Sequence, residues 1–391
     1  MPSCQPTCVR LDGHWYDLSR LAHPGGKELI ARQAGKDVTA LFYANHFGGF
    51  SSKKALIARF LAKGASDAPP LPHPLLQHCS PLYATLKAQV QAHLHEHGLV
   101  WRHRFGWKQT AFRLACLSLA WLLRSGGGWA RTAVACTYGL ATGRATWTHV
   151  HNAVHNPFLL SRSARAFFDA DYAGVVGLWM AEHHAHHAHT NGPHDPDVAW
   201  FAPLVSYGSI ARFGGGPAVA LAAVVAYPLF FVAMLVKSTV YALTSNSQKG
   251  RQAVGVVCAL APLRFGLDFS VLGLRGFCAA LSAASLYLIF TFVATHQTRA
   301  NHRLSSGDWM VDQMHATNNV APDSQAWSWA CGGINCHIEH HLFPMLSSNT
   351  LPRVAPLVRR FAAENGLPYH SYPSLLSLLS AHATFLARPT S

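Results

Sequence analysis

The sequence predicts an all-α membrane domain with about four transmembrane helices and a histidine-rich cap on its cytosolic side, preceded by a small separate unit. Three features support this architecture: long apolar stretches, three histidine clusters beside them, and a proline-rich segment near residue 70. Of the 391 residues, 50% are hydrophobic and only 12% are charged. This composition is too apolar for an ordinary soluble protein and too polar for a chain lying wholly in a bilayer.

Charge and cysteine content narrow the class of protein. The formal net charge of +14 comes from scattered Lys and Arg residues without a basic run interleaved with aromatics, which does not favour a nucleic-acid partner. The excess of positive charge fits the positive-inside bias of cytoplasmic segments, as at Arg162, Arg165, Arg353, Arg359 and Arg360.

Nine cysteines without C-x-x-C pairs indicate a reducing compartment. The opening MPSCQPTCVR lacks the apolar core of a signal peptide, which predicts a cytosolic N-terminus.

The first unit, residues 1–62, carries the motifs DGHWYDLSRLAHPGG and GKDVTALFYANH. HPGG alone is more often a surface turn, but in this combination the unit resembles cytochrome b5. The resemblance implies a small α+β domain that binds haem b through His23 and His46 as axial ligands. Gly25 and Gly26 would form the tight turn that brings one histidine to the iron. Ligation by two histidines leaves no open coordination position on the haem iron, which suits electron transfer.

A linker is predicted at residues 63–78, because this segment contains four prolines and few core-forming residues. An extended proline-rich chain of this length reaches at most about 50 Å, at ~3.1 Å per residue. Such a tether would keep the first unit at high local concentration over the membrane domain, which is predicted to occupy residues 79–391.

Four apolar windows are long enough to cross a hydrocarbon core of ~30 Å at ~1.5 Å per residue. They are 109–128, 129–148, 217–241 and 271–295. The boundaries of the first two are less sharp because of Arg113, Arg131 and Arg144. If the second and third histidine clusters reach one site, they lie on the same side of the membrane, so an even number of spans must separate them. The last two windows meet this condition. The intermediate stretch 254–267 is short and broken by Pro262 and Arg264, so it is expected to lie at the interface or bend back.

The three histidine clusters read HNAVH at 151–155, HHAHH at 183–187 and HIEHH at 337–341. At about 100° per residue, a helix places His151 and His155 about 40° apart. The same rotation places the triplets His183, His186, His187 and His337, His340, His341 each within an arc of ~100°. His149 would point away from His151, and His184 would lie at the edge of its cluster.

A single pair of histidines four residues apart is more often solvated or packed than bound to a metal. Three such clusters in one chain favour metal binding. Zinc held by three histidines and a water is a competing interpretation, but eight histidines exceed one tetrahedral site, and imidazole also suits iron.

Together with HNAVHNP, the segments LWMAEHHAHHAHTNGPHDPDV, QMHATNNV, GGINCHIEHHLFP and PYHSYPS make residues 110–375 resemble a membrane fatty acyl desaturase. With the fused haem unit included, the chain resembles the front-end subgroup of these desaturases. The resemblance implies two non-haem iron ions held by the eight cluster histidines and by His296 in FVATH, whose simpler interpretation is a helix-end cap. No catalytic residue beyond these ligands is implied.

The resemblance also implies the partners and the location. Electrons would come from NADH-cytochrome b5 reductase or an equivalent donor, pass through the haem to the two irons, and reduce O₂ as co-substrate. The resulting oxidant would remove two hydrogens from an acyl-lipid or acyl-CoA substrate. The protein would lie in the endoplasmic reticulum membrane, in contact with membrane lipids, with the haem unit and the histidine clusters on the cytosolic side.

The sequence departs from the family pattern at two positions. Asn152 stands where the family usually has Asp, a carboxylate expected to orient a liganding histidine from outside the metal's own ligand set. His337 stands where front-end members commonly have Gln, which weakens the subgroup assignment. Asp195 and Asp197 match the family's DPD and are expected to support the metal site from a loop that shapes the substrate entrance.

Three alternatives remain open on sequence grounds. A hydroxylase or an acetylenase could use the same scaffold. A membrane-anchored haem electron carrier without desaturase activity is disfavoured by the repeated clusters, and a zinc-dependent membrane hydrolase or receptor would have no use for the haem unit. These motifs do not encode the length of the substrate's acyl chain, the headgroup that carries it or the position of the new double bond.

Overall fold

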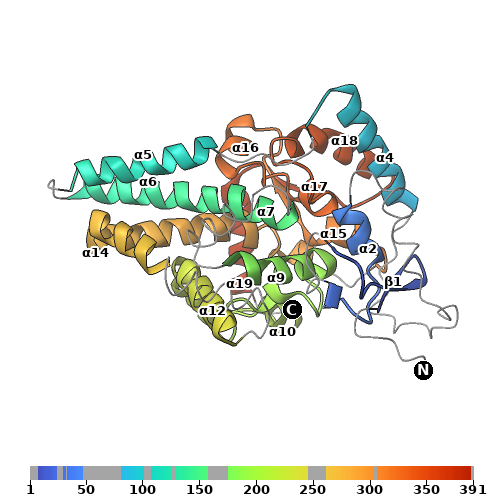
Figure 1. Ribbon diagram of the computed structural model, residues 1–391, viewed down its shortest axis with the longest axis horizontal. Coiled ribbons are helices and arrows are strands. Elements are labelled where there is room, and N and C mark those ends of the chain that lie inside the picture. Colours follow the sequence, from blue (N-terminus) through green and yellow to red (C-terminus); the bar gives the residue numbers. More distant parts are fainter. Residues whose placement is uncertain are drawn as a thin grey trace.

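A computed structural model of the chain describes residues 8–23, 30–31, 33–46, 81–100, 107–124, 128–156, 175–244, 261–302 and 306–388. Gly25, Gly26 and the predicted linker 63–78 lie outside the described residues, as do the predicted domain boundaries at residues 62 and 79. The described part is mostly helical (Figure 1).

The N-terminal unit contains two antiparallel strands and a short helix. β1 (Cys8–Leu11) pairs with β2 (His14–Asp17) through a turn in which Asp12 and Gly13 both have positive φ. Val9, Leu11 and Tyr16 from the strands pack against Phe42 of α2 (Thr39–Asn45). This small α+β core positions His46 at the end of α2.

Three long helices form one end of the molecule. α5 (Trp107–Leu122) and α6 (Trp129–Thr146) make a hairpin that lies beside α14 (Ala261–Leu288) (Figure 1). Large apolar side chains on the hairpin face outward, with Trp107 72% and Trp129 81% exposed. Exposed apolar surface of this kind marks contact with lipid or with another protein.

Two described helices, Pro217–Lys237 and Pro262–Val293, are long and apolar enough to cross a membrane. They overlap the predicted spans 217–241 and 271–295. The predicted spans 109–128 and 129–148 correspond to the shorter and less apolar helices α5 and α6, with 16 and 18 residues. The structure therefore confirms a mostly helical domain but does not confirm four spans.

The helix α14 is interrupted at Gly273, where φ is 66° and ψ is 171°. The Phe277 ring lies 6.4 Å from that of Phe265 and 5.8 Å from that of Phe269. Residues 265 and 277 would be about 18 Å apart along a straight helix, so residues 261–272 fold back on the part that follows. The described part of the predicted stretch 254–267 thus lies in the segment that folds back, and the bend itself is at Gly273, beyond that stretch.

A buried polar cluster ties the returning segment to α6. Tyr138 donates its hydroxyl hydrogen to Asp268, with an oxygen–oxygen distance of 2.8 Å, and Arg264 pairs with the same carboxylate at 3.0 Å. Arg131 of α6 donates to the carbonyl of Val271 at 2.9 Å. Buried ionised groups are stable only when paired in this way.

The closest approach of α6 to α14 depends on Gly139. A Cβ at this position would overlap the carbonyl oxygen of Ala280. We expect Gly139→Ala to push the two helices apart and to lower the unfolding free energy by about 1–3 kcal/mol, as overpacking does elsewhere. The measurement is thermal unfolding of the purified protein in detergent. Gly266→Ala is the matched control, because a Cβ there meets no atom within 4 Å; equal Tm values for the two variants would contradict close packing at Gly139.

The remaining elements either form or continue the apolar helices, as α11, η5, α12 and η7 do, or build the cap. Within it, β3 and β4 pair in parallel, and Trp309, Met310, Met314 and Phe343 are fully buried in its core. The bounds of these elements are α4 (Pro81–Glu96), η3 (Trp147–His151), α7 (Asn152–His155), α9 (Val175–His189), η4 (Pro196–Ala199), α10 (Tyr207–Phe213), α11 (Pro217–Ala226), η5 (Tyr227–Leu229), α12 (Phe230–Thr244), η7 (Ile289–Val293), η8 (Arg299–Asn301), α15 (Trp309–Ala316), β3 (Asn318–Val320), α16 (Gln325–Cys331), α17 (His337–Leu342), α18 (Leu351–Glu364), β4 (His370–Tyr372) and α19 (Leu375–Ala387).

Candidate metal centre

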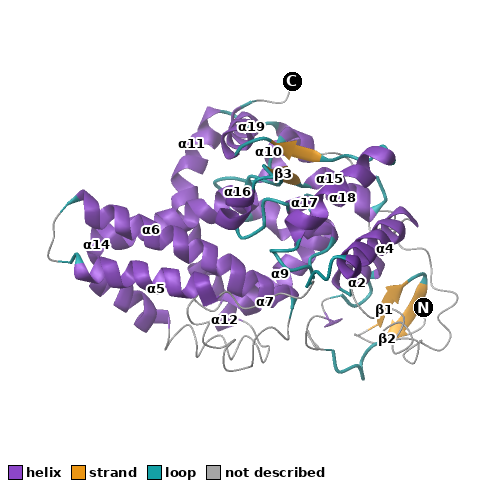
Figure 2. Ribbon diagram, turned by 90° about the horizontal axis from the view of Figure 1, so that it is seen from above, coloured by secondary structure: helices purple, strands orange, loops and turns teal. Residues whose placement is uncertain are grey.

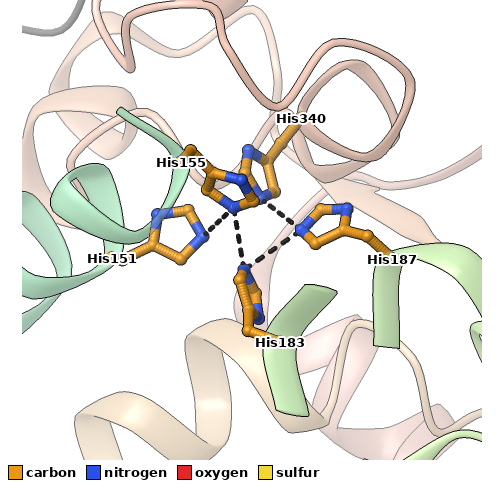
Figure 3. Close-up of side chains that lie close together, drawn as sticks. All are labelled: His151, His155, His183, His187 and His340. Carbon is orange, nitrogen blue, oxygen red and sulfur yellow. Dashed lines mark hydrogen bonds between the residues drawn. The ribbon is translucent and has the colours of Figure 1, made fainter. Parts of the chain in front are cut away.

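Five buried histidines from three segments converge on one point (Figure 3). Nε2 of His155 lies 3.2 Å from Nε2 of His151 and 2.9 Å from that of His183. Nε2 of His187 lies 3.1 Å from that of His183 and 3.1 Å from that of His340. We call these five residues the first histidine group.

Hydrogen bonds alone cannot account for this arrangement. Each Nε2 has either one hydrogen to donate or one lone pair to accept with, so Nε2 of His155, His183 and His187 cannot each satisfy two such contacts. Two imidazoles bound at right angles to one ion, with bonds of about 2.1 Å, place their nitrogens about 3.0 Å apart. Burial lowers the pKa of His183 and of His187, and neighbouring histidines lower it further, which keeps the rings in the neutral form that binds metals.

A second histidine group consists of His186, His296 and His341. Nε2 of His186 lies 3.3 Å from Nε2 of His296. Nε2 of His341 is buried and has no hydrogen-bond partner in the described part of the chain, as expected for an atom that faces a cation. The His337 ring lies beside this group, with its centre 4.5 Å from that of His296 and 5.0 Å from that of His341.

The structure therefore brings all nine predicted ligands together, eight of them in two groups that could each hold one metal ion and His337 alongside. The residues fit a pair of imidazole-bound cations. His149 and His184, which helical geometry had excluded, lie outside both groups; Nε2 of His149 is 3.3 Å from the hydroxyl of Thr110.

Hydrogen bonds at Nδ1 orient four of these rings. His296 donates to the carbonyl of Ala316 at 2.9 Å. Nδ1 of His337 contacts the Thr295 hydroxyl at 2.7 Å, and Nδ1 of His341 donates to Oε1 of Gln313 at 2.8 Å. A partner at Nδ1 fixes the tautomer and directs Nε2 toward the metal.

The fourth oriented ring is His186, whose partner is Asp195. Nδ1 lies 3.0 Å from the Asp195 carboxylate and 3.5 Å from that of Asp197. Burial disfavours the charged ring, but the two carboxylates outweigh burial and raise the pKa of His186 to about 9. Asp195 is thus placed to support the metal site through direct contact with a ligand. Asn152, the other residue expected to do so, accepts a hydrogen bond from Ser348 at 3.3 Å.

Sequence reasoning missed Thr295, Gln313 and the carbonyl of Ala316. The motif QMHATNNV was noticed without a role for its residues, yet it supplies two of these partners and also Asn319. The Asn319 side chain accepts from the backbone of Ile338 at 2.9 Å and donates to Glu339 at 2.8 Å, and Tyr369 donates to Glu339 at 2.9 Å. Burial raises the pKa of Glu339 to about 7. These contacts hold α17, which carries the third histidine cluster.

Two π-helical turns lie next to ligand positions. η3 ends at His151, and η7 ends three residues before His296. A π-helical turn adds a residue to the helix and changes the direction of the side chains that follow, and such turns are frequent at functional sites. They allow two helices with exposed apolar side chains to present histidines inward at their ends.

In the N-terminal unit the predicted haem ligands face each other. The ring centres of His23 and His46 are 6.1 Å apart. Two imidazoles on opposite sides of one iron, each with a bond of about 2 Å, place their ring centres about 6 Å apart. His46 donates from Nδ1 to the carbonyl of Phe42 at 2.8 Å, and Lys87 of the cap donates to the carbonyl of His46 at 3.2 Å. The two described sites therefore belong to units in direct contact.

An apolar pocket lies against the second histidine group. Trp179, Phe230, Met234, Leu288 and Phe292 line it, and His183, His186, His296 and His337 form its polar end. A pocket lined in this way suits a hydrocarbon chain.

Replacing Asp195 with asparagine tests the support given to His186. We expect Asp195→Asn to lower metal affinity and product formation about 10- to 100-fold, because loss of the partner of a liganding histidine has effects of this size. Competition with a chelator measures the affinity. Asp323→Asn is the control, since Asp323 is exposed and pairs with Arg359 away from the site. An Asp195 variant that keeps wild-type affinity would contradict the assignment.

Comparison with known proteins agrees with this geometry. The family model for fatty acid desaturase matches residues 127–373, and the model for the cytochrome b5-like heme/steroid binding domain matches residues 3–79. The chain belongs to the fatty acid desaturase family and carries a fused cytochrome b5 domain, as the sequence motifs predicted. It is therefore an oxidoreductase.

Its relatives are front-end desaturases. Fatty acid desaturase 3 of Homo sapiens is 28% identical, covering 93% of this chain and 85% of the relative. Delta(5) fatty acid desaturase A of Dictyostelium discoideum is 23% identical, covering 97% and 89%, and the acyl-lipid (8-3)-desaturase of Mortierella alpina is 23% identical, covering 97% and 92%. No solved structure matches the chain.

The role of His337 can be tested by comparing side chains of different ligand strength. We expect activity to decrease in the order His337, His337→Gln, His337→Ala, because imidazole binds iron better than an amide oxygen and alanine leaves a position open. Product per folded, haem-loaded enzyme is the measured quantity. If the glutamine and alanine variants are equally active, His337 only packs near the site.

Proposed function

We propose that this protein is an O₂-dependent di-iron desaturase of the front-end type, which inserts a double bond into an already unsaturated fatty acyl chain. Electrons reach the metal site through the protein's own cytochrome b5 domain from NADH-cytochrome b5 reductase or an equivalent donor. The observation that carries the proposal is the pair of converging histidine groups beside an apolar pocket. One group alone would suit a single metal ion, whereas two adjacent groups suit a pair.

In this proposal the nine histidines His151, His155, His183, His186, His187, His296, His337, His340 and His341 hold the two irons. The bound irons supply activation of O₂ and removal of two hydrogens from the acyl chain. The chain's own residues do the rest: Asp195, Thr295 and Gln313 orient the ligand rings, and Trp179 and Phe292 pack around the hydrocarbon and exclude water. No acid–base dyad is required.

The same arrangement supports a proposal for the location. Ligands from η3, α7, α9 and α17 come together at one end of the α5–α6 hairpin, away from its turn (Figure 1). We place this end on the cytosolic side of the endoplasmic reticulum membrane, where a soluble reductase can reach the haem domain. α5, α6 and the two long apolar helices would supply four membrane-embedded segments.

Metal and product measurements on the full chain test this function. The purified protein should contain about three iron atoms, one in haem and two in the histidine groups. Expression in a host without polyunsaturated fatty acids, with candidate acids supplied, should yield a new double bond near the carboxyl end. Haem iron alone would indicate an electron carrier, zinc without haem would indicate a hydrolase or receptor, and a hydroxylated or acetylenic product would indicate a different outcome on the same scaffold.

A further inference from the structure

A second pocket, distinct from the apolar one, lies between α10, η8 and the end of α19. Arg299, His302 and Arg388 contribute its polar side chains, and Phe385 and Gly214 form part of its wall. Figure 2 shows α10, α11 and α19 gathered near the C-terminus. We call this the basic pocket.

The walls of the basic pocket are fixed by the fold. On one side Gly215 donates to the carbonyl of Arg388 at 3.0 Å and Gly216 donates to that of Leu386 at 2.9 Å. A Cβ at Gly215 would overlap the Leu386 carbonyl, so this contact requires glycine. The glycine loop thereby holds the backbone of Arg388 in place.

The opposite wall is also held by local contacts. η8 begins with a capping box between Thr298 and Asn301, which fixes the backbone around Arg299. The His302 ring stacks on Phe385, with ring centres 4.8 Å apart and planes 7° from parallel. The two arginines therefore line one pocket from two separately anchored segments.

The charge of the pocket selects an anion. Two of its seven lining residues are arginines, and none of the seven is acidic. The planar fork of a guanidinium group matches the oxygens of a phosphate and forms paired, charge-assisted hydrogen bonds with it. Two such groups from different segments suit a phosphate better than a single carboxylate.

The surroundings place the pocket at the edge of apolar surface. Phe213, at the end of α10, is 68% exposed, and Leu221 and Val224 on α11 are 66% and 68% exposed. α11 begins the apolar helix Pro217–Lys237, which has a mean hydropathy of 2.6. A basic pocket where an apolar helix begins is placed at the level of lipid headgroups.

A single hydrogen-bonded pair links the basic pocket to the apolar pocket. Gln297 lines the apolar pocket, and its Oε1 accepts from Nε2 of His302 at 2.7 Å. Arg299 is three residues from His296, so their Cα atoms are at most about 11 Å apart. An acyl carrier anchored in the basic pocket would therefore present the carboxyl half of its chain, not the methyl end, to the histidine groups.

We propose that the basic pocket binds a phosphate group of the molecule that carries the acyl substrate, with Arg299 and Arg388 as the binding residues. This inference rests on the proposed function, because it assigns the headgroup end of the same substrate. Phospholipids and coenzyme A thioesters both offer such a phosphate, and the experiment distinguishes them.

The test uses the full-length enzyme, loaded with metal and haem, together with its reductase. It compares three carriers of the same acyl chain as substrates. The carriers are a phosphatidylcholine, the coenzyme A thioester and the methyl ester, which lacks phosphate. Arg299→Gln and Arg388→Gln should each lower the ratio of kcat/KM for the phosphate carrier to that for the methyl ester about tenfold, the effect expected from one lost charge-assisted hydrogen bond. The carrier whose ratio falls identifies the source of the phosphate. Arg360→Gln, on the exposed face of α18, should keep the wild-type ratio.

A binding measurement separates failure of this inference from failure of the proposed function. Calorimetry with a short-chain phosphatidylcholine and with coenzyme A needs no turnover, and a diacylglycerol serves as the phosphate-free control. The wild type should bind a phosphate compound more tightly than the diacylglycerol. This binding should weaken about tenfold in each glutamine variant and be partly restored by Arg299→Lys. These results would support the pocket even if no desaturated product forms. Unchanged binding and unchanged kcat/KM ratios in both variants overturn it even if the enzyme is an active desaturase.

Discussion

Alanine at His155 is expected to lower product formation by more than about a hundredfold while leaving the haem absorbance at the wild-type level. Nε2 of His155 contacts Nε2 of both His151 and His183, so its loss removes the link between the first cluster and the second. Iron bound outside the haem should fall together with activity. Metal analysis and product analysis of the same preparation provide both values.

His184→Ala is the matched control for this experiment. His184 is buried and its ring centre is 5.8 Å from that of His155, but it belongs to neither histidine group. This variant should keep substantial activity, as should His149→Ala. If His184 proved indispensable and His155 dispensable, the positions assigned to these two rings would be incorrect.

The second large effect is expected at the haem. His46→Ala should abolish the haem absorbance, because one of the two facing imidazoles is removed. The membrane domain should remain folded and keep its non-haem iron, since among the described residues both histidine groups draw only on positions from His151 to His341. Product formation should collapse in a host without free cytochrome b5.

A host that supplies free cytochrome b5 is the control, because an external carrier can replace a missing internal one. Partial recovery of product there would show that the variant's metal site is intact. Loss of non-haem iron together with haem would instead mean that the two sites assemble as one unit, contrary to the proposed separation of domains.

The positions of the cluster histidines were predictable because helical rotation alone brings residues four apart onto one face. His151 and His155, for example, need no information from the rest of the chain to lie together. The partners at Nδ1 were not predictable in this way. Gln313 is 28 residues from His341, and Thr295 is 42 residues from His337, so these contacts depend on how the helices of the cap pack.

The fold shows the same division. Apolar length predicted spans at 217–241 and 271–295, which overlap the long helices Pro217–Lys237 and Pro262–Val293, because burial in lipid depends mainly on local composition. The position of the bend in α14 depends on the contact of that helix with α6, which no single segment encodes. Gly273 has no local sequence signal that distinguishes it from Gly266 or Gly276, and only the packed structure identifies it as the bend.

The short parallel pairing of β3 with β4 bears on the order in which the enzyme matures. Glu339, between two ligands of the third cluster, receives a hydrogen bond from Tyr369, and His382 of α19 contacts the carbonyl of Gln297, next to His296. The first residue of the two histidine groups is His151, yet these later contacts come only after residue 368. Because these later residues hold the third cluster and the segment next to His296, we expect iron to bind only after they have packed against the cap. A shortened C-terminus would accordingly produce a membrane-bound protein that carries haem but accepts iron poorly.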